Sequence, residues 1–287
     1  RGDVPHHGES ALMTLIMGVV NVTPDSFSDG GRWFDEADAI AHGRQLIADG
    51  ADILDIGGES TRPGAERPSV DEELRRVIPV VRELAGLGVP ISVDTMRARV
   101  AEAAVAAGAG ILNDVSGGLA DPSMVAFAAE CRLPFVAMHW RGHSATMQSR
   151  AVYTDVVADV CRELAERRDR LVEAGVSPAQ IVLDPGLGFA KEPQHNWSLL
   201  GGLSAVQALG HRVLVGASRK RFLTRVEEAS GRPVRRFDDS DVETAAVSVV
   251  ARLSDVWGVR VHDVDMTRRA LAVAGAGAGS RGTDLQR

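Results

Sequence analysis

Short apolar runs recur along the chain, and a polar loop follows each of them. Their length and their content of Val and Ile are typical of buried β-strands. Because the runs are nearly continuous rather than alternating, they favour parallel strands that are covered on both faces. We expect eight such strands, at residues 15–22, 53–57, 91–94, 111–115, 135–139, 181–184, 213–217 and 259–264.

Amphipathic stretches lie between these runs. Their apolar residues recur every three or four positions, which is the helical period. We expect helices at residues 37–49, 70–87, 97–107, 122–131, 153–174 and 242–256. Alternating strands and helices predict an α/β fold, a (β/α)8 TIM barrel. A doubly wound sheet is the alternative, but the glycine-rich dinucleotide turn that usually follows its first strand is missing from this sequence.

Length and composition fit a single domain. The chain has 287 residues, 45% of them hydrophobic, and no internal linker. We expect the barrel to span residues 13–272, between an N-terminal extension (1–12) and a Gly/Ala-rich tail (273–287), both expected to be disordered. The net charge of −7 argues against general nucleic-acid binding, which needs a basic face.

Other sequence features bear on localisation. No apolar stretch approaches the ~20 residues of a membrane span, and the first ten residues lack the apolar core of a secretory signal. Cys131 and Cys161 lie inside expected helices and form no metal-binding pattern. These features predict a cytoplasmic protein that binds small molecules and neither membrane nor nucleic acid.

Polar residues concentrate after the expected strands rather than before them. The segments before strands, such as 88–90 and 108–110, are short connectors of Gly, Ala, Val and Pro. The residues at or just after the strand ends include Asn21, Glu59, Asp94, Asn113, His139, Asp184, Ser218, Lys220, Arg260 and His262. Since the carboxyl ends of all strands in a TIM barrel face one mouth, this asymmetry predicts a polar site there.

Single residues in this set also have structural interpretations. Asp94 could cap the helix that follows it, and Asn113 and Asp114 could satisfy strand-end amides. His139 could be a buried hydrogen-bonding residue rather than a base. The Thr-Pro-Asp-Ser stretch after the first strand is also ordinary turn chemistry.

The cationic residues have two interpretations as well. Arg260 and His262 alternate along the last strand and therefore point the same way, which suits an anion. A salt bridge to a neighbouring carboxylate is the alternative for Arg260, and the same two possibilities apply to Lys220.

Eight segments, taken in order, extend this picture: NVTPDSFSDGG, GADILDIGGESTRPG, SVDT, NDVSGG, MHWRG, LDPGLGF, GASRKRF and RVHDV. Together they resemble the dihydropteroate synthase family of folate biosynthesis, in its bacterial form, over residues 16–266. The resemblance implies that para-aminobenzoate displaces pyrophosphate from 6-hydroxymethyl-7,8-dihydropterin pyrophosphate to give 7,8-dihydropteroate. It also implies a requirement for Mg²⁺.

The resemblance further implies roles for individual residues. Those matching the pterin site are Asp94, Asn113, Met138, Asp184 and Lys220. Those matching the aminobenzoate site are Thr61, Arg62, Pro63, Gly188, Phe189 and Ser218. Those matching the pyrophosphate site are Asn21, Arg260 and His262, with Asn21 also a Mg²⁺ ligand. The residues expected to act in catalysis are Asp25, Lys220, Arg260 and His262.

The expected mechanism follows from the nucleophile. An aromatic amine is already unprotonated at neutral pH, so a strong general base is not required. We expect pyrophosphate to leave first, assisted by Mg²⁺ and cationic side chains, and the cation left on the pterin to be captured by the amine. Asp25 would join the site when the first loop closes. Trp140, Ser144 and Arg221 depart from the family pattern, which puts one loop and one wall in doubt.

Two other functions remain as alternatives. A pterin-binding methyltransferase would share the pterin cluster but would need neither the pyrophosphate residues nor the first loop. A non-catalytic relative would have lost charged residues from the mouth. The family resemblance also implies a homodimer through C-terminal helices, and the expected helix 242–256 is consistent with that.

Overall fold

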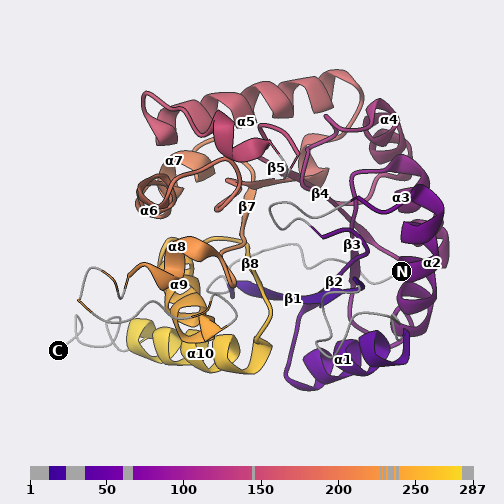
Figure 1. The fold of residues 1–287 in the computed structure, drawn as a ribbon, viewed down its shortest axis with the longest axis horizontal. Coiled ribbons are helices and arrows are strands. Elements are labelled where there is room, and N and C mark those ends of the chain that lie inside the picture. The colour runs from indigo at the N-terminus through magenta and orange to yellow at the C-terminus, as the bar shows by residue number, and fades with distance from the viewer. Residues whose placement is uncertain are drawn as a thin grey trace.

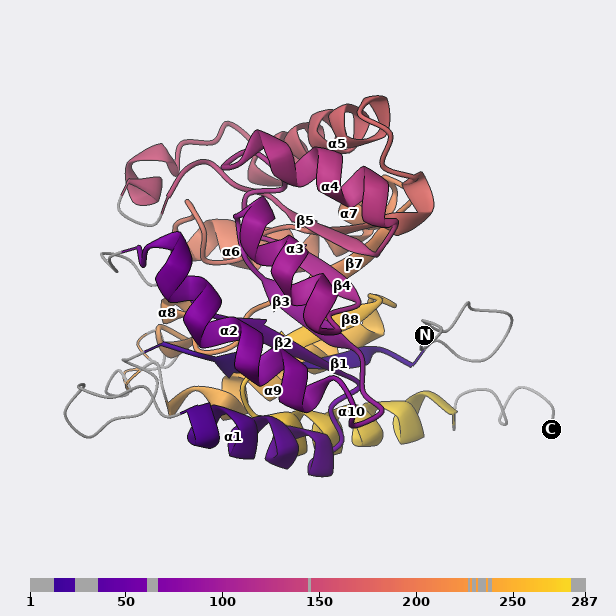
Figure 2. The ribbon, with the colours of Figure 1, turned by 90° about the vertical axis from the view of Figure 1, so that its right-hand side faces the viewer.

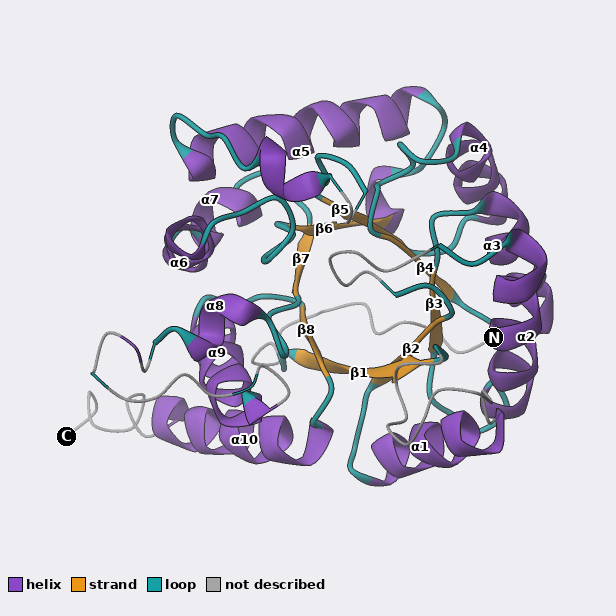
Figure 3. Cartoon of the chain, viewed as in Figure 1, coloured by secondary structure: helices purple, strands orange, loops and turns teal. Residues whose placement is uncertain are grey.

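The computed structural model describes residues 13–23, 36–60, 67–143, 146–226, 228, 231, 236 and 239–279. Within these residues, eight parallel strands close into a barrel in chain order, which confirms the predicted TIM barrel (Figures 1 and 3). The strands are β1 (Leu15–Asn21), β2 (Ile53–Gly57), β3 (Ile91–Asp94), β4 (Ile111–Asp114), β5 (Phe135–Met138), β6 (Ile181–Asp184), β7 (Arg212–Val215) and β8 (Gly258–Val261).

Helices cover the outside of the barrel, and Figure 2 shows α1 to α5 following one another around it. The helices are α1 (Glu36–Ala48), α2 (Val70–Leu84), α3 (Ala98–Ala107), α4 (Pro122–Cys131), α5 (Val156–Glu173), α6 (Pro193–Gly201), α7 (Leu203–Gln207), α8 (Arg221–Thr224), α9 (Asp241–Leu253) and α10 (Val264–Gly279). No helix in the described residues is both long and apolar enough to cross a membrane.

Element ends differ from the expected ones by a few residues where side chains form caps. β8 ends at Val261 rather than at 264 because Asp263 accepts a hydrogen bond from the Met266 amide and begins α10. The last helix also corrects the expected tail, since α10 continues to Gly279 and includes residues 273–279. Alanine alternates with glycine there, and alanine favours helix. Residues 1–12 and 280–287 lie outside the described part.

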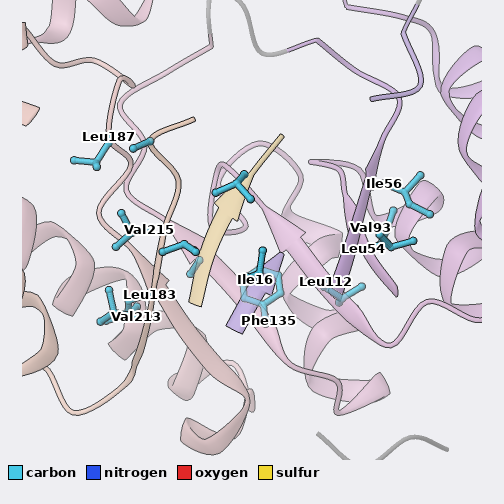
Figure 4. Close-up of a cluster of buried hydrophobic side chains, with 14 of the residues drawn as sticks. Ile16, Leu54, Ile56, Val93, Leu112, Phe135, Leu183, Leu187, Val213 and Val215 are labelled. Atoms are coloured by element: carbon cyan, nitrogen blue, oxygen red, sulfur yellow. The ribbon is translucent and has the colours of Figure 1, made fainter. Parts of the chain in front are cut away.

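The apolar core has two parts, which follow from the alternation of side chains along each strand. Outward-facing side chains such as Leu54 and Phe135 pack between strands and helices (Figure 4). Inward-facing side chains fill the lower barrel and are Met17, Ile53, Ile111, Val136, Val182, Leu214 and Trp257. This inner cluster closes the bottom of the barrel and leaves only its upper layer for polar residues.

Candidate active site

The upper layer of the barrel interior is polar because of strand register. Asp55, Asn113 and Asp184 each follow an inward-facing apolar residue of the same strand by two positions. Asp55 pairs in register with Ser92, and Asp94 pairs with Asn113. The pleat therefore places these side chains together just above the apolar plug.

Arg260 from β8 joins this layer and connects two of its carboxylates. Its Nε donates to Asp55 Oδ2 at 2.6 Å, and its Nη2 donates to Asp94 Oδ2 at 2.7 Å. The Asn113 amide nitrogen also donates to Asp55 Oδ2, at 3.0 Å. Four side chains from four different strands thus form one hydrogen-bonded network, and the salt-bridge alternative for Arg260 is what the structure shows.

Asp94 is part of this network and does not cap α3. The backbone amide of Ala98 in α3 donates to Asp121 Oδ2 instead, at 2.9 Å. Burial raises the pKa of Asp94 to about 7, and the neighbouring Asp55 charge adds to this, while Arg260 opposes it.

Asp184 and Lys220 form the opposite side of the mouth. Asp184 Oδ1 accepts a hydrogen bond from the Gly186 amide at 2.7 Å, and burial raises the pKa of this carboxyl. Burial lowers the pKa of Lys220 to about 8, while the charge of Asp184 opposes that shift. Lys220 Nζ donates to the carbonyls of Leu187 and Gly216 and lies 4.8 Å from the centre of the Phe189 ring.

An apolar wall lies beside these polar groups. Met96, Val115 and Met138 are buried together, and Trp140 and Phe189 pack against them. A thioether and aromatic wall next to hydrogen-bonding groups suits a flat heterocycle. Of this set, the sequence pointed only to Met138 and Phe189. Met96 and Val115 each follow a polar strand-end residue by two positions. Because side chains two positions apart in a strand point the same way, the sequence could have predicted that both face the mouth.

Asn21, His262 and Ser218 lie together at the edge of the mouth. The Asn21 amide nitrogen is 3.4 Å from His262 Nε2, and Ser218 Oγ is 2.8 Å from His262 Nδ1. If Nδ1 carries the proton, it donates to Ser218 and Nε2 accepts from Asn21, which satisfies both contacts. The Ser218 hydroxyl therefore contacts a residue of the expected pyrophosphate site rather than the Phe189 wall.

A buried lysine that the sequence did not single out supports the loop after β6. Lys191 Nζ donates to His139 Nδ1 at 3.0 Å and to the carbonyls of Gly186 and Phe189 at 2.9 and 3.0 Å. Its three N–H groups are thus all used, although burial lowers the pKa of Lys191 to about 7. His139 in turn lies 2.9 Å from Glu163, so it is the structural residue of the two alternatives.

The residues fit a magnesium site of few protein ligands. No group of three or more His, Cys, Asp and Glu side chains that could hold a metal occurs in the described part of the chain. Mg²⁺ commonly takes one or two protein oxygens and completes its shell with water and phosphate. With its nitrogen directed to His262, the Asn21 amide presents its oxygen as such a ligand.

Four of the expected site residues cannot be placed. Asp25, Thr61, Arg62 and Pro63 lie outside the described residues, as does Ser144.

A cavity of about 320 Å³ lies behind the apolar wall, between Trp140 and the arginines of α5. Its lining includes Met138 but no residue of the polar network.

The mouth of this closed parallel barrel combines buried carboxylates, an amide and cations with a thioether wall. These features define an enzyme that binds a flat, anionic substrate through hydrogen bonds. The family comparison agrees with this class. Residues 17–262 match the model for pterin binding enzymes, and the chain belongs to that family.

Several similar proteins carry the name dihydropteroate synthase. The chain is 52% identical to dihydropteroate synthase of Mycobacterium leprae, over 91% of this chain and 92% of that protein. It is 46% identical to dihydropteroate synthase of Bacillus subtilis, over 93% and 90% of the two chains. A Xanthomonas albilineans dihydropteroate synthase solved with 4-aminobenzoic acid superposes with a TM-score of 0.85 at 43% identity, covering 93% of this chain and 94% of that one.

Proposed function

We infer that the chain is a dihydropteroate synthase. It joins para-aminobenzoate to 6-hydroxymethyl-7,8-dihydropterin pyrophosphate and releases 7,8-dihydropteroate and pyrophosphate. The observation that carries this inference is the mouth network of Asp55, Asn113, Asp94 and Arg260, opposite Asp184 and Lys220. A Xanthomonas albilineans relative solved in complex with 7,8-dihydropteroate, 40% identical with a TM-score of 0.82, supports it.

The pterin binds between the polar layer and the apolar wall. Adjacent N–H groups on the pterin edge donate to Asp184, whose Oδ1 is already oriented by the Gly186 amide. Asn113 both donates and accepts, which suits the mixed edge of the ring. Gly216 leaves this side open, since a Cβ there would lie 3.8 Å from Asp184 Oδ2 and 3.9 Å from Lys220 Nζ. Asp94, Met138 and Lys220 complete the proposed pterin site.

The aminobenzoate site is proposed next to the loop after β6. Phe189 supplies an aromatic face, and Gly188 permits the close approach of Lys220, because a Cβ there would lie 2.7 Å from Lys220 Cδ. The other residues expected at this site are Thr61, Arg62 and Pro63, whereas Ser218 is reassigned to the pyrophosphate site because its hydroxyl contacts His262.

Pyrophosphate and magnesium belong at the Asn21 edge of the mouth. Asn21, Arg260 and His262 bind the diphosphate, and Asn21 holds Mg²⁺. When bound, the metal neutralises charge that builds up on the leaving group. Arg260 and Lys220 keep their positive charges at neutral pH, so both stabilise the departing diphosphate. Asp25 completes the catalytic set. After the C–O bond to the diphosphate breaks, the aromatic amine forms the C–N bond with the pterin cation and releases one proton to solvent.

The alternatives explain fewer of these features. A pterin-binding methyltransferase would use the pterin layer, but it would not need the Asn21–His262–Ser218 group. A non-catalytic relative would not be expected to retain Arg260 bonded to Asp55 and Asp94, or Lys220 within the electrostatic influence of Asp184.

We propose that two copies associate through the outer face of α9, in the cytoplasm. Val242, Ala246, Val250 and Leu253 fall on one side of this helix and are exposed. The exposed Val273 of α10 lies on the neighbouring helix, which packs on α9. Cys131 and Cys161 are free thiols, which suits a reducing compartment.

The reaction is tested by measuring pyrophosphate release with both substrates and Mg²⁺. We expect release that depends on each of the three components and that a sulfonamide suppresses competitively with aminobenzoate. The control omits aminobenzoate and reports background hydrolysis. No release above that background would rule out the proposed activity, and magnesium-independent release would remove the metal from it.

A further inference from the structure

One carboxylate of the mouth network has no role in the function proposed above. Asp55 lies in the middle of β2 and is fully buried. Its Oδ2 accepts hydrogen bonds from two residues that are proposed to touch substrate, Asn113 at 3.0 Å and Arg260 at 2.6 Å. Asp55 shares the layer of Asn113 and Asp184 above the apolar plug, but its side chain is completely shielded from solvent, whereas Asn113 and Asp184 keep 5% and 7% exposure.

The hydrogen bond from Asn113 decides which way its amide faces. An amide presents a donor on one side and an acceptor on the other, and the two orientations have nearly the same shape. A carboxylate only accepts, so the Asn113 NH2 group must point to Asp55. The Asn113 carbonyl oxygen is then directed away from Asp55 and serves as an acceptor for an N–H group of the ring.

A purely structural role explains Asp55 less well. Its second oxygen, Oδ1, is buried and has no hydrogen-bond partner among the described residues, and the same is true of the Ser92 hydroxyl, its register partner. A buried carboxylate with an unsatisfied oxygen costs stability. Local rules are commonly broken in this way at functional sites.

We propose that Asp55 is a positioning residue that fixes the Asn113 amide with its carbonyl oxygen toward the pterin. This proposal rests on the proposed function for the identity of the ring. Its test measures ligand binding separately from turnover. Arg260 also donates to Asp94, and we expect this bond to hold Arg260 in place when Asp55 is changed, so that the effect on Asn113 can be measured separately.

The test is a double-mutant cycle read out as the dissociation constant for the pterin pyrophosphate and as kcat and KM. Asp55→Ala is expected to weaken pterin binding by about tenfold or more, because Asn113 loses the partner that orients it. The main effect should appear in KM, with kcat changed by less than about threefold. In an Asn113→Ala background the same change should weaken binding by less than about threefold, since no amide remains to be oriented.

Two further variants keep the test decisive. Asp55→Asn retains an oxygen acceptor and should recover most of the binding. Asp55→Leu keeps the side-chain volume without an acceptor, and it carries the cycle if Asp55→Ala does not fold. Ser92→Ala removes a neighbouring buried oxygen that makes no hydrogen bond to any described residue, and it should bind the pterin as the wild type does.

Equal losses of binding in the wild-type and Asn113→Ala backgrounds would overturn the proposal, as would unchanged binding in Asp55→Ala. A wild type that binds the pterin but releases no pyrophosphate would instead contradict the proposed function, and the binding cycle would still decide the role of Asp55.

Discussion

At the scale of single residues, Asp184 gives the most specific prediction about pterin binding. In Asp184→Asn the amide oxygen can keep the hydrogen bond from Gly186, so the loop should survive. The amide nitrogen then faces N–H donors of the pterin. We expect the KM for the pterin pyrophosphate to rise about tenfold to a hundredfold, with little change in melting temperature. Unchanged pterin binding would remove Asp184 from this role.

His139 gives a prediction for pH. Burial and the charge of Lys191 lower the pKa of His139 to about 4, well below the ~6.5 of an unperturbed histidine. Between these values the unfolded chain binds a proton that the folded chain does not, so the stability present above pH 6.5 is lost as the pH falls toward 4. This shift corresponds to about 3 kcal/mol.

Denaturant unfolding of His139→Gln at several pH values tests this. Glutamine does not titrate, so its unfolding free energy should fall less steeply between pH 6.5 and 4 than that of the wild type. Parallel curves for the two proteins would show that another group carries the acid sensitivity.

The neighbouring residues Asn113 and Asp114 of β4 direct their side chains to different partners. Asn113 faces the barrel interior, whereas Asp114 accepts hydrogen bonds from the amides of Ser116 and Gly118. Burial raises the pKa of Asp114 to about 6. The sequence left the same alternatives open for both residues, because it does not contain the contacts that separate them.

At the scale of elements, the loop after β6 depends on Gly186. Its φ is +67°, and a Cβ there would lie 2.5 Å from the His139 carbonyl oxygen. Gly186→Ala should therefore destabilise the protein by about 2 kcal/mol or more, and it should weaken pterin binding because Asp184 is oriented by this amide.

The matched control is Gly201→Ala in α6, where a Cβ would meet nothing within 4 Å. Alanine favours helix over glycine, so this variant should be neutral or more stable by up to about 1 kcal/mol. Thermal unfolding of both variants compares the two sites. A similar loss in both would mean that the strain at Gly186 is not the cause.

At the scale of the whole molecule, the open question is association. Leu253 is 67% exposed at the end of the apolar face of α9. Leu253→Asp places a charge on the proposed interface and should convert a dimer to a monomer in sedimentation velocity. Val152 is 78% exposed away from that helix, so Val152→Asp should leave the sedimentation coefficient unchanged. A wild type that sediments as a monomer would contradict the dimer.

The sequence by itself determined the barrel and most of its mouth. Strand and helix periods are local properties, so the eight strands were visible in the chain before any contact was known. The position of Asp184 and Lys220 at strand ends was visible for the same reason, because parallel strands in a barrel share one direction.

Only the tertiary structure decided which of these polar residues act together. The hydrogen bonds of Asp55 to Asn113 and Arg260 join residues 58 and 205 positions apart in the chain. The buried contact between Lys191 and His139 likewise crosses 52 positions. Such partners depend on strand register and on closure of the barrel, and neither is encoded in a local run of residues.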